Sequence, residues 1–109
     1  MTSTRKLSDP VSLPCGVVVP NRIAKAALTE GLSGGDNQAN ERFVRLYRRW
    51  GEGGAGMLIT GNVLVDRYHL ERGGNLAIEG AQDNQSLSSL AAMASAAKAN
   101  GSLIVMQLN

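Results

Sequence analysis

The chain has 109 residues, which leaves room for one domain at most. Its formal net charge is +2 and 18% of its residues are charged, so composition gives no sign of nucleic-acid binding, while the single cysteine, Cys15, excludes an intramolecular disulfide. No apolar run is long enough for a membrane span and the first residues lack the apolar core of a signal peptide, so we expect a soluble cytoplasmic protein without nucleic-acid or membrane partners.

The first part of the chain is rich in turn residues. Residues 1–20 contain three prolines around Val17–Val19 and predict an extended arm or a hairpin. Residues 22–29 are a candidate first strand, although their alanines leave a helix as the alternative. Residues 30–40 are rich in glycine, serine, asparagine and aspartate, which predicts a loop that ends at a helix-capping asparagine, Asn37 or Asn40.

A helix is predicted over residues 41–50, because four large apolar side chains recur at helical spacing and share one face: Phe43, Leu46, Tyr47 and Trp50. Four arginines lie around the remainder of this helix. We interpret them as a solvated face, with a phosphate-binding or nucleic-acid-binding patch as the alternative. Gly51 is the expected end of the helix.

The glycines of residues 51–56 match G-x-G-x-x-G. A dinucleotide fingerprint follows a strand and opens a helix, whereas this one closes a helix and opens a strand, so we reject a Rossmann site. The apolar run that follows, residues 57–59, predicts a strand buried on both faces. It turns polar at Thr60 and Asn62, at the end where parallel α/β sheets bind ligands.

The second half of the chain predicts a loop, a helix and a third strand. The loop covers residues 66–82 and carries His69, for which no second ligand at metal spacing exists, so we expect no metal site. The helix covers residues 83–100, and its expected apolar stripe is Leu87, Leu90, Ala91, Ala94 and Ala97. The strand covers residues 102–109 and turns polar at Gln107.

Strands that alternate with helices indicate an α/β fold with a parallel sheet. Three strands with two helices would expose apolar edges, whereas a closed (β/α)8 barrel takes roughly 250 residues. We therefore interpret residues 21–109 as the N-terminal part of a (β/α)8 (TIM) barrel, about three βα units long and truncated.

Three stretches in this order resemble the N-terminal part of the NADH:flavin oxidoreductases, the Old Yellow Enzyme family: NRIAKAALT (21–29), GGAGMLITGN (53–62) and QLN (107–109). RLYRRW (45–50) and LERGGN (70–75) are similar to one branch of it. The resemblance implies an FMN-dependent barrel that takes hydride from NAD(P)H and passes it to a small-molecule substrate, an activated alkene or a similar acceptor.

The resemblance also implies cofactor-binding residues. The segment beneath the isoalloxazine ring would be Ala26, Ala27, Leu28 and Thr29, with the Thr29 hydroxyl near the O4/N5 edge. Asn62 would face the flavin, and Gln107 would pair with its pyrimidine edge. Many relatives have a proline in place of Ala27 and an acidic residue in place of Gly61. The family's proton donor and substrate anchors fall beyond Asn109, so no catalytic residue is named and we expect this chain alone to be inactive.

Two other interpretations stay open. The chain could be a small standalone α/β module that binds an acidic partner through its arginine-rich helix face. It could also belong to a TIM barrel of other chemistry, such as a phosphate-binding aldolase. For the full-length parent, the sequence leaves a homo-oligomer open.

Overall fold

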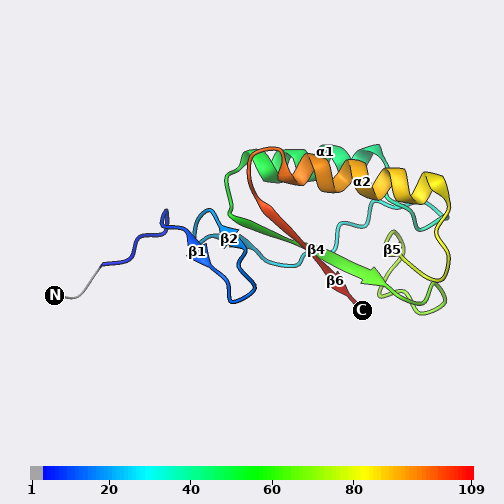
Figure 1. Cartoon of the computed structure of the whole chain (residues 1–109). Coiled ribbons are helices and arrows are strands. Elements are labelled where there is room, and N and C mark those ends of the chain that lie inside the picture. Colours follow the sequence, from blue (N-terminus) through cyan, green and yellow to red (C-terminus); the bar gives the residue numbers. More distant parts are fainter. Residues whose placement is uncertain (1–3) are drawn as a thin grey trace.

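The computed structural model describes residues 4–109 and shows two helices that cover one face of a small parallel sheet (Figure 1). The α/β class with parallel strands is therefore confirmed. In chain order the elements are β1 (Val11–Ser12), β2 (Val18–Val19), β3 (Ala24–Lys25), α1 (Glu41–Glu52), β4 (Met57–Leu64), β5 (Leu76–Ala77), α2 (Asn84–Lys98) and β6 (Leu103–Leu108).

Strands β1 and β2 form an antiparallel hairpin in the segment where we expected an arm or a hairpin. Val11 lies opposite Val19, and the turn between the strands carries the exposed thiol of Cys15. Figure 1 shows that the hairpin projects beyond the amino end of β4, away from the two helices. Residues 1–3 lie outside the described part of the chain.

Helix α1 begins where Asn40 caps it, since the Asn40 side chain accepts hydrogen bonds from the backbone N–H groups of Arg42 and Phe43. The predicted apolar face is confirmed in part: Phe43 and Tyr47 are fully buried, but Leu46 points to the outer flank of the helix and Val44 is buried in its place. The predicted end at Gly51 is wrong. The helix continues to Glu52 and Gly53 is its cap, because the Gly53 N–H still bonds to the Trp50 carbonyl.

Strand β4 is the centre of the sheet. Strand β6 runs parallel along one of its edges, from Met57 opposite Leu103 to Val63 opposite Leu108. Strands β3 and β5 share the other edge, since β3 pairs with the first two residues of β4 and β5 pairs with its last two. A stretch of that second edge, residues 59–62, therefore has no strand beside it.

One strand prediction and one loop prediction are wrong. Residues 22–29 contain only the two-residue strand β3, because the chain leaves the ladder after Lys25 and bends over the end of β4. Residues 66–82 are not an unbroken loop, because β5 pairs in parallel with Val63 and Leu64. Leu76 and Ala77 are buried there, so apolar burial holds this short strand in place.

The predicted stripe of α2 is only partly right. Ala97 is buried, but Leu87 and Ala91 are exposed, and the buried positions include Met93 and Ser86. Helix α2 packs along α1 as well as over the sheet, and this rotates its buried face away from the expected stripe (Figure 1). Within residues 4–109, no helix is long and apolar enough to cross a membrane.

The core lies between the helices and the sheet. Buried apolar side chains of both layers form it: Phe43, Val44 and Tyr47 of α1, Leu58 and Val63 of β4, Leu76 of β5, and Met93, Ala96 and Ala97 of α2. Along β6, Ile104 packs against this cluster while Val105 is exposed. Because side chains alternate along a strand, Gln107 lies on the same face as Val105, opposite the helices.

Candidate functional site

Two amide side chains meet where β4 and β6 end. Asn62 pairs with Gln107 across the ladder, and the Gln107 Nε2 donates a hydrogen bond of 2.7 Å to Asn62 Oδ1. Within residues 4–109, this bond leaves the Asn62 Nδ2 donor and the Gln107 Oε1 acceptor free of protein partners. The carboxyl end of the sheet thus presents one donor and one acceptor side by side.

The pairing of these amides depends on a register shift in β4. Ile59 lies opposite Val105, but Asn62 lies opposite Gln107, so three steps along β4 match two along β6. The Thr60 hydroxyl takes the place of a ladder bond: it accepts the Gln107 backbone N–H at 3.0 Å and donates to the Gly61 carbonyl at 2.8 Å. The extra residue turns Asn62 to the face that carries Gln107.

The segment that leaves β3 lies beside this pair. A β-carbon on Gly61 would lie only 2.4 Å from the Leu28 carbonyl oxygen, so the backbone of Leu28 passes directly against β4. The side chains of Ala26 and Leu28 are exposed, and Ala27 is half-buried. The hydroxyl of Thr29 donates a 3.1 Å hydrogen bond to Glu71 Oε2 in the loop before β5.

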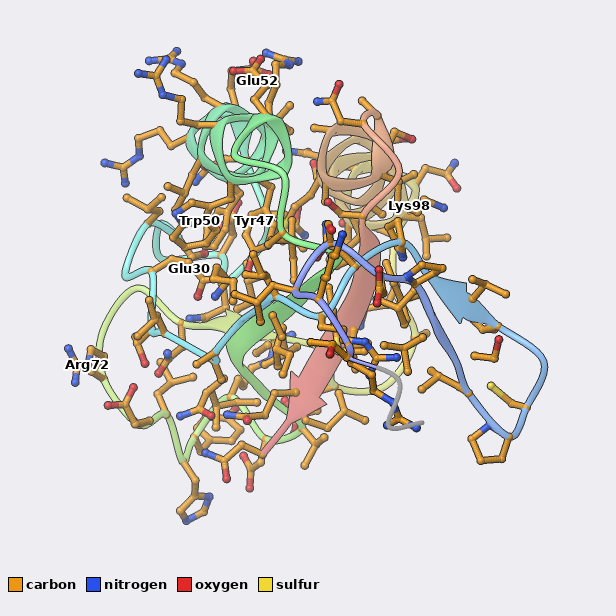
Figure 2. All side chains as sticks on the ribbon, turned by 90° about the vertical axis from the view of Figure 1, so that its left-hand side faces the viewer. Glu30, Tyr47, Trp50, Glu52, Arg72 and Lys98 are labelled. Carbon is orange, nitrogen blue, oxygen red and sulfur yellow. The ribbon has the colours of Figure 1, made fainter. Side chains whose placement is uncertain are left out.

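Two residues of this region were not predicted as site residues, Glu30 and Tyr47. The Glu30 carboxylate accepts hydrogen bonds from the Tyr47 hydroxyl and from the Gly61 backbone N–H, and Figure 2 shows it beside Tyr47 beneath α1. Burial raises the pKa of Tyr47, and the hydrogen bond and negative charge of Glu30 raise it further. A carboxylate directly after the predicted strand end at Thr29 was the only sequence signal for this contact.

A flavin, which the resemblance implies, has a flat ring and one polar edge. A pyrimidine-type ring edge carries alternating donors and acceptors, which the free donor of Asn62 and the free acceptor of Gln107 can complement. Small side chains at Ala26 and Ala27 let a flat ring approach the backbone, and the exposed Leu28 adds apolar surface. The residues present therefore fit the group.

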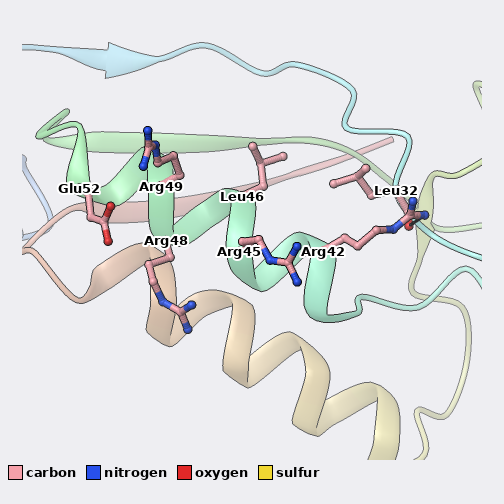
Figure 3. A pocket seen from close by; sticks show the side chains of 7 residues that line it. All are labelled: Leu32, Arg42, Arg45, Leu46, Arg48, Arg49 and Glu52. Atoms are coloured by element: carbon pink, nitrogen blue, oxygen red, sulfur yellow. Dashed lines mark hydrogen bonds between the residues drawn. The ribbon is translucent and has the colours of Figure 1, made fainter.

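A groove of about 600 Å³ lies elsewhere, on the outer flank of α1 (Figure 3). Its wall combines two leucines with charged side chains: Leu32, Leu46, Arg42, Arg45, Arg48, Arg49 and Glu52. Arg42 is fixed by a 2.7 Å hydrogen bond from its Nη2 to the Leu32 carbonyl. The groove holds no residue of the predicted flavin site, so the arginine face and the strand ends are separate features.

The lone histidine is part of a loop contact. Its Nδ1 lies 2.7 Å from Asp66 Oδ2, and the ring is largely exposed. The hydrogen bond from the Tyr68 backbone N–H lowers the pKa of Asp66, and the hydrogen bond with His69 lowers it further. In the part of the chain that the structure describes, no three His, Cys, Asp or Glu side chains gather in a group able to hold a metal ion.

No protein-family model matches the chain. It is 38% identical over 100 residues to the NADH-dependent flavin oxidoreductase iliE of Neonectria sp. (strain DH2), covering 91% of this chain and 13% of that protein. It is 37% identical over 103 residues to iliE of Hypocrea jecorina (strain QM6a), covering 94% and 26%. The chain thus spans about a quarter or less of these relatives.

Among solved structures, the chain is similar to the Old Yellow Enzyme homologue from Zymomonas mobilis, with a TM-score of 0.79 and 23% identity. The similarity covers 95% of this chain and 28% of that one. At this identity the likeness concerns the fold: the chain has the fold of part of a TIM barrel, as the sequence predicted.

Proposed function

We propose that this chain, which belongs to the NADH:flavin oxidoreductase (Old Yellow Enzyme) family and spans part of its members' length, supplies FMN-binding strand ends to an NAD(P)H-dependent oxidoreductase. When bound, FMN would carry a hydride from NAD(P)H to an activated alkene or a similar small-molecule acceptor. The protein's own contribution is to bind, orient and polarise that group.

The observation that carries the proposal is the amide pair at the ends of β4 and β6. Asn62 Nδ2 would donate to the flavin's polar edge and Gln107 Oε1 would accept from it, while their mutual 2.7 Å bond holds both amides in place. Preorganised dipoles of this kind stabilise charge that develops on a reacting group. Neither amide titrates near neutral pH, so this pair binds and orients without exchanging a proton.

The segment that follows β3 would lie beneath the ring. The small side chains of Ala26 and Ala27 leave its backbone accessible to a flat ring, and the main chain of Leu28 lies against β4. Thr29 differs from the simplest expectation, because its hydroxyl already donates to Glu71. As long as the Glu71 contact persists, this hydroxyl can only accept, whereas O4 and N5 of oxidised flavin are themselves acceptors, so Thr29 would have to release Glu71 before it could donate to that edge.

The rival interpretations have less support. The relatives described above carry the name flavin oxidoreductase, which favours this chemistry over an aldolase. The arginine-lined groove offers charge but no reacting group, so a binding module built on that face is the weaker proposal. We propose a cytoplasmic protein without nucleic-acid or membrane partners. A homo-oligomer is proposed only for the full-length parent.

Titration of the chain with FMN, followed by flavin fluorescence, tests the proposal. We expect saturable binding that Gln107→Ala weakens about ten- to hundredfold, since unpaired polar groups cost about 1–3 kcal/mol. Gln85→Ala, an exposed position on α2, is the matched control and should bind as the wild type does. Equal affinity of both variants, or no binding by the wild type, contradicts the placement of the flavin.

A turnover assay adds a second test. We expect the 109 residues with added FMN to oxidise NADH no faster than free FMN does, because the strand ends described above supply binding groups and no proton donor. A rate above that of free FMN that scales with protein concentration would show that the chain is active by itself.

A further inference from the structure

The Glu30 carboxylate occupies the vacant stretch of the β4 edge. This stretch, residues 59–62, lies between β3 and β5 and has no strand to bond to. Glu30 Oε2 accepts the Gly61 backbone N–H at 3.3 Å. A β-carbon on Gly61 would lie 2.1 Å from Glu30 Oε1, so the carboxylate fills the space that a side chain at this position would need. A side chain thus stands in for the missing strand.

Tyr47 holds that carboxylate from the helix layer. Its side chain is fully buried, and its hydroxyl donates a 2.5 Å hydrogen bond to the same oxygen, Glu30 Oε2. Its ring is fixed in turn by an edge-on contact with Trp50, with centroids 5.1 Å apart and planes at 82°. The phenol therefore ties the carboxylate to α1, so that Glu30 links the helix layer to the sheet.

Both backbone polar groups of Gly61 have side-chain partners. Glu30 binds its N–H from the open edge of β4, and Thr60 binds its carbonyl while accepting the Gln107 N–H from β6. These contacts surround the one place where β4 has a residue more than β6. That extra residue brings Asn62 level with Gln107.

We propose that Glu30 is a positioning residue, whose carboxylate, oriented by Tyr47, fixes the register shift of β4 and so holds Asn62 beside Gln107. Its effect on the strand is independent of any ligand. Its effect on FMN rests on the function proposed above, because it acts through the amide pair.

Amide hydrogen exchange measured by NMR on the FMN-free chain tests the effect on the strand. In Glu30→Ala, we expect exchange at Gly61 and Gln107 to accelerate at least tenfold more than at Leu58, in the amino half of β4. Glu30→Gln keeps a carbonyl oxygen and should restore most of the protection. Glu52→Ala, an exposed carboxylate at the end of α1, is the control and should change none of these rates.

A purely structural role would accelerate all amides of β4 by one common factor, and that result overturns the proposal. Tyr47→Phe provides a second test if Glu30→Ala does not fold. It keeps the carboxylate but removes its donor, so exchange at Gly61 should accelerate more than exchange at Leu58. If the two amides change by the same factor, the proposed role of Tyr47 is contradicted.

FMN titration of the same variants tests the second step. Glu30→Ala should weaken binding about tenfold, with partial rescue in Glu30→Gln. Failure of the wild type to bind FMN would refute the proposed function and leave the exchange result to decide the role of Glu30. Selective exchange without any change in FMN affinity would overturn the link from Glu30 to the flavin.

Discussion

The two ends of β4 are built in similar ways for different purposes. At the amino end, the Asn21 side chain packs against Gly56. Its Oδ1 accepts the Gly56 N–H at 2.7 Å and its Nδ2 donates to the Gly54 carbonyl at 2.7 Å. At the carboxyl end, Glu30 closes against Gly61. In both cases a side chain from a segment flanking β3 binds the backbone N–H of a glycine that leaves no room for a β-carbon.

The ends differ in what they leave unpaired. At the amino end, both polar atoms of the Asn21 side chain bond to the protein itself, so the contact closes the structure. At the carboxyl end, Glu30 stabilises a backbone shift whose result is an amide pair with a free donor and a free acceptor. This division matches parallel barrels in general, where the amino face serves stability and the carboxyl face serves ligands.

Gly61→Ala should have the largest effect, because it damages the carboxyl end in both stability and binding. The new β-carbon would overlap the Leu28 carbonyl oxygen, which is main chain and cannot rotate away. We expect a loss of about 3 kcal/mol in the free energy of unfolding, at the upper end for overpacking, and loss of FMN binding. Urea unfolding and FMN titration measure the two effects. Gly35→Ala, where the space is open, is the control, and equal stability of the two variants contradicts the prediction.

Gly56→Ala should affect stability alone. Its β-carbon would lie 2.7 Å from the Asn21 carbonyl oxygen, and we expect a loss of about 2 kcal/mol in the free energy of unfolding. The molecules that remain folded should bind FMN with wild-type affinity. A weaker affinity per folded molecule would show that the two ends are not separate in function.

Asn21→Ala should have a smaller effect in the same direction. It removes the hydrogen bonds to Gly54 and Gly56 without introducing a clash, so we expect a loss of about 1 kcal/mol in the free energy of unfolding. FMN affinity should not change. Urea unfolding of this variant beside Glu30→Ala compares the two contacts directly, and only the Glu30 variant should weaken the binding of FMN.

Alkaline pH should separate the ends most finely, because only the carboxyl end contains a titrating phenol. The folded state raises the pKa of Tyr47 above its ordinary value of 10.0, so above pH 10 the unfolded chain loses a proton that the folded chain keeps. The stabilising contribution is thus complete below pH 10 and falls as pH rises, by about 1 kcal/mol at pH 11. Urea unfolding at pH 9 and pH 11 should show this loss in the wild type and in Tyr68→Phe, but not in Tyr47→Phe.

The elements with a strong local pattern could be predicted from the sequence. Helix α1 follows from the spacing of Phe43 and Tyr47 and from the capping asparagine before it. Strands β4 and β6 follow from short apolar runs that end in polar residues. The polar ends also predicted that Asn62 and Gln107 lie at one edge of the sheet, where the structure places them together.

The features that depend on distant partners could not be predicted. Strand β5 has two residues inside a glycine-rich loop, and only its partner in β4 makes it a strand. The bend after Lys25 is set by contacts of Thr29 with Glu71 and of Glu30 with Tyr47 and Gly61, which are 42, 17 and 31 residues away. No local period of apolar residues contains such information, which is why the first strand was predicted too long.

The register shift in β4 also constrains the length of the chain, apart from its composition. A deletion at Thr60 or Gly61 would restore an even ladder, and each later residue of β4 would then turn to the opposite face of the sheet. Val63, which is 1% exposed, would leave the core, and Asn62 would turn away from Gln107. An insertion at the same place would have a similar effect. Among homologous chains, insertions and deletions should therefore be far rarer at these two positions than in the loop of residues 66–75.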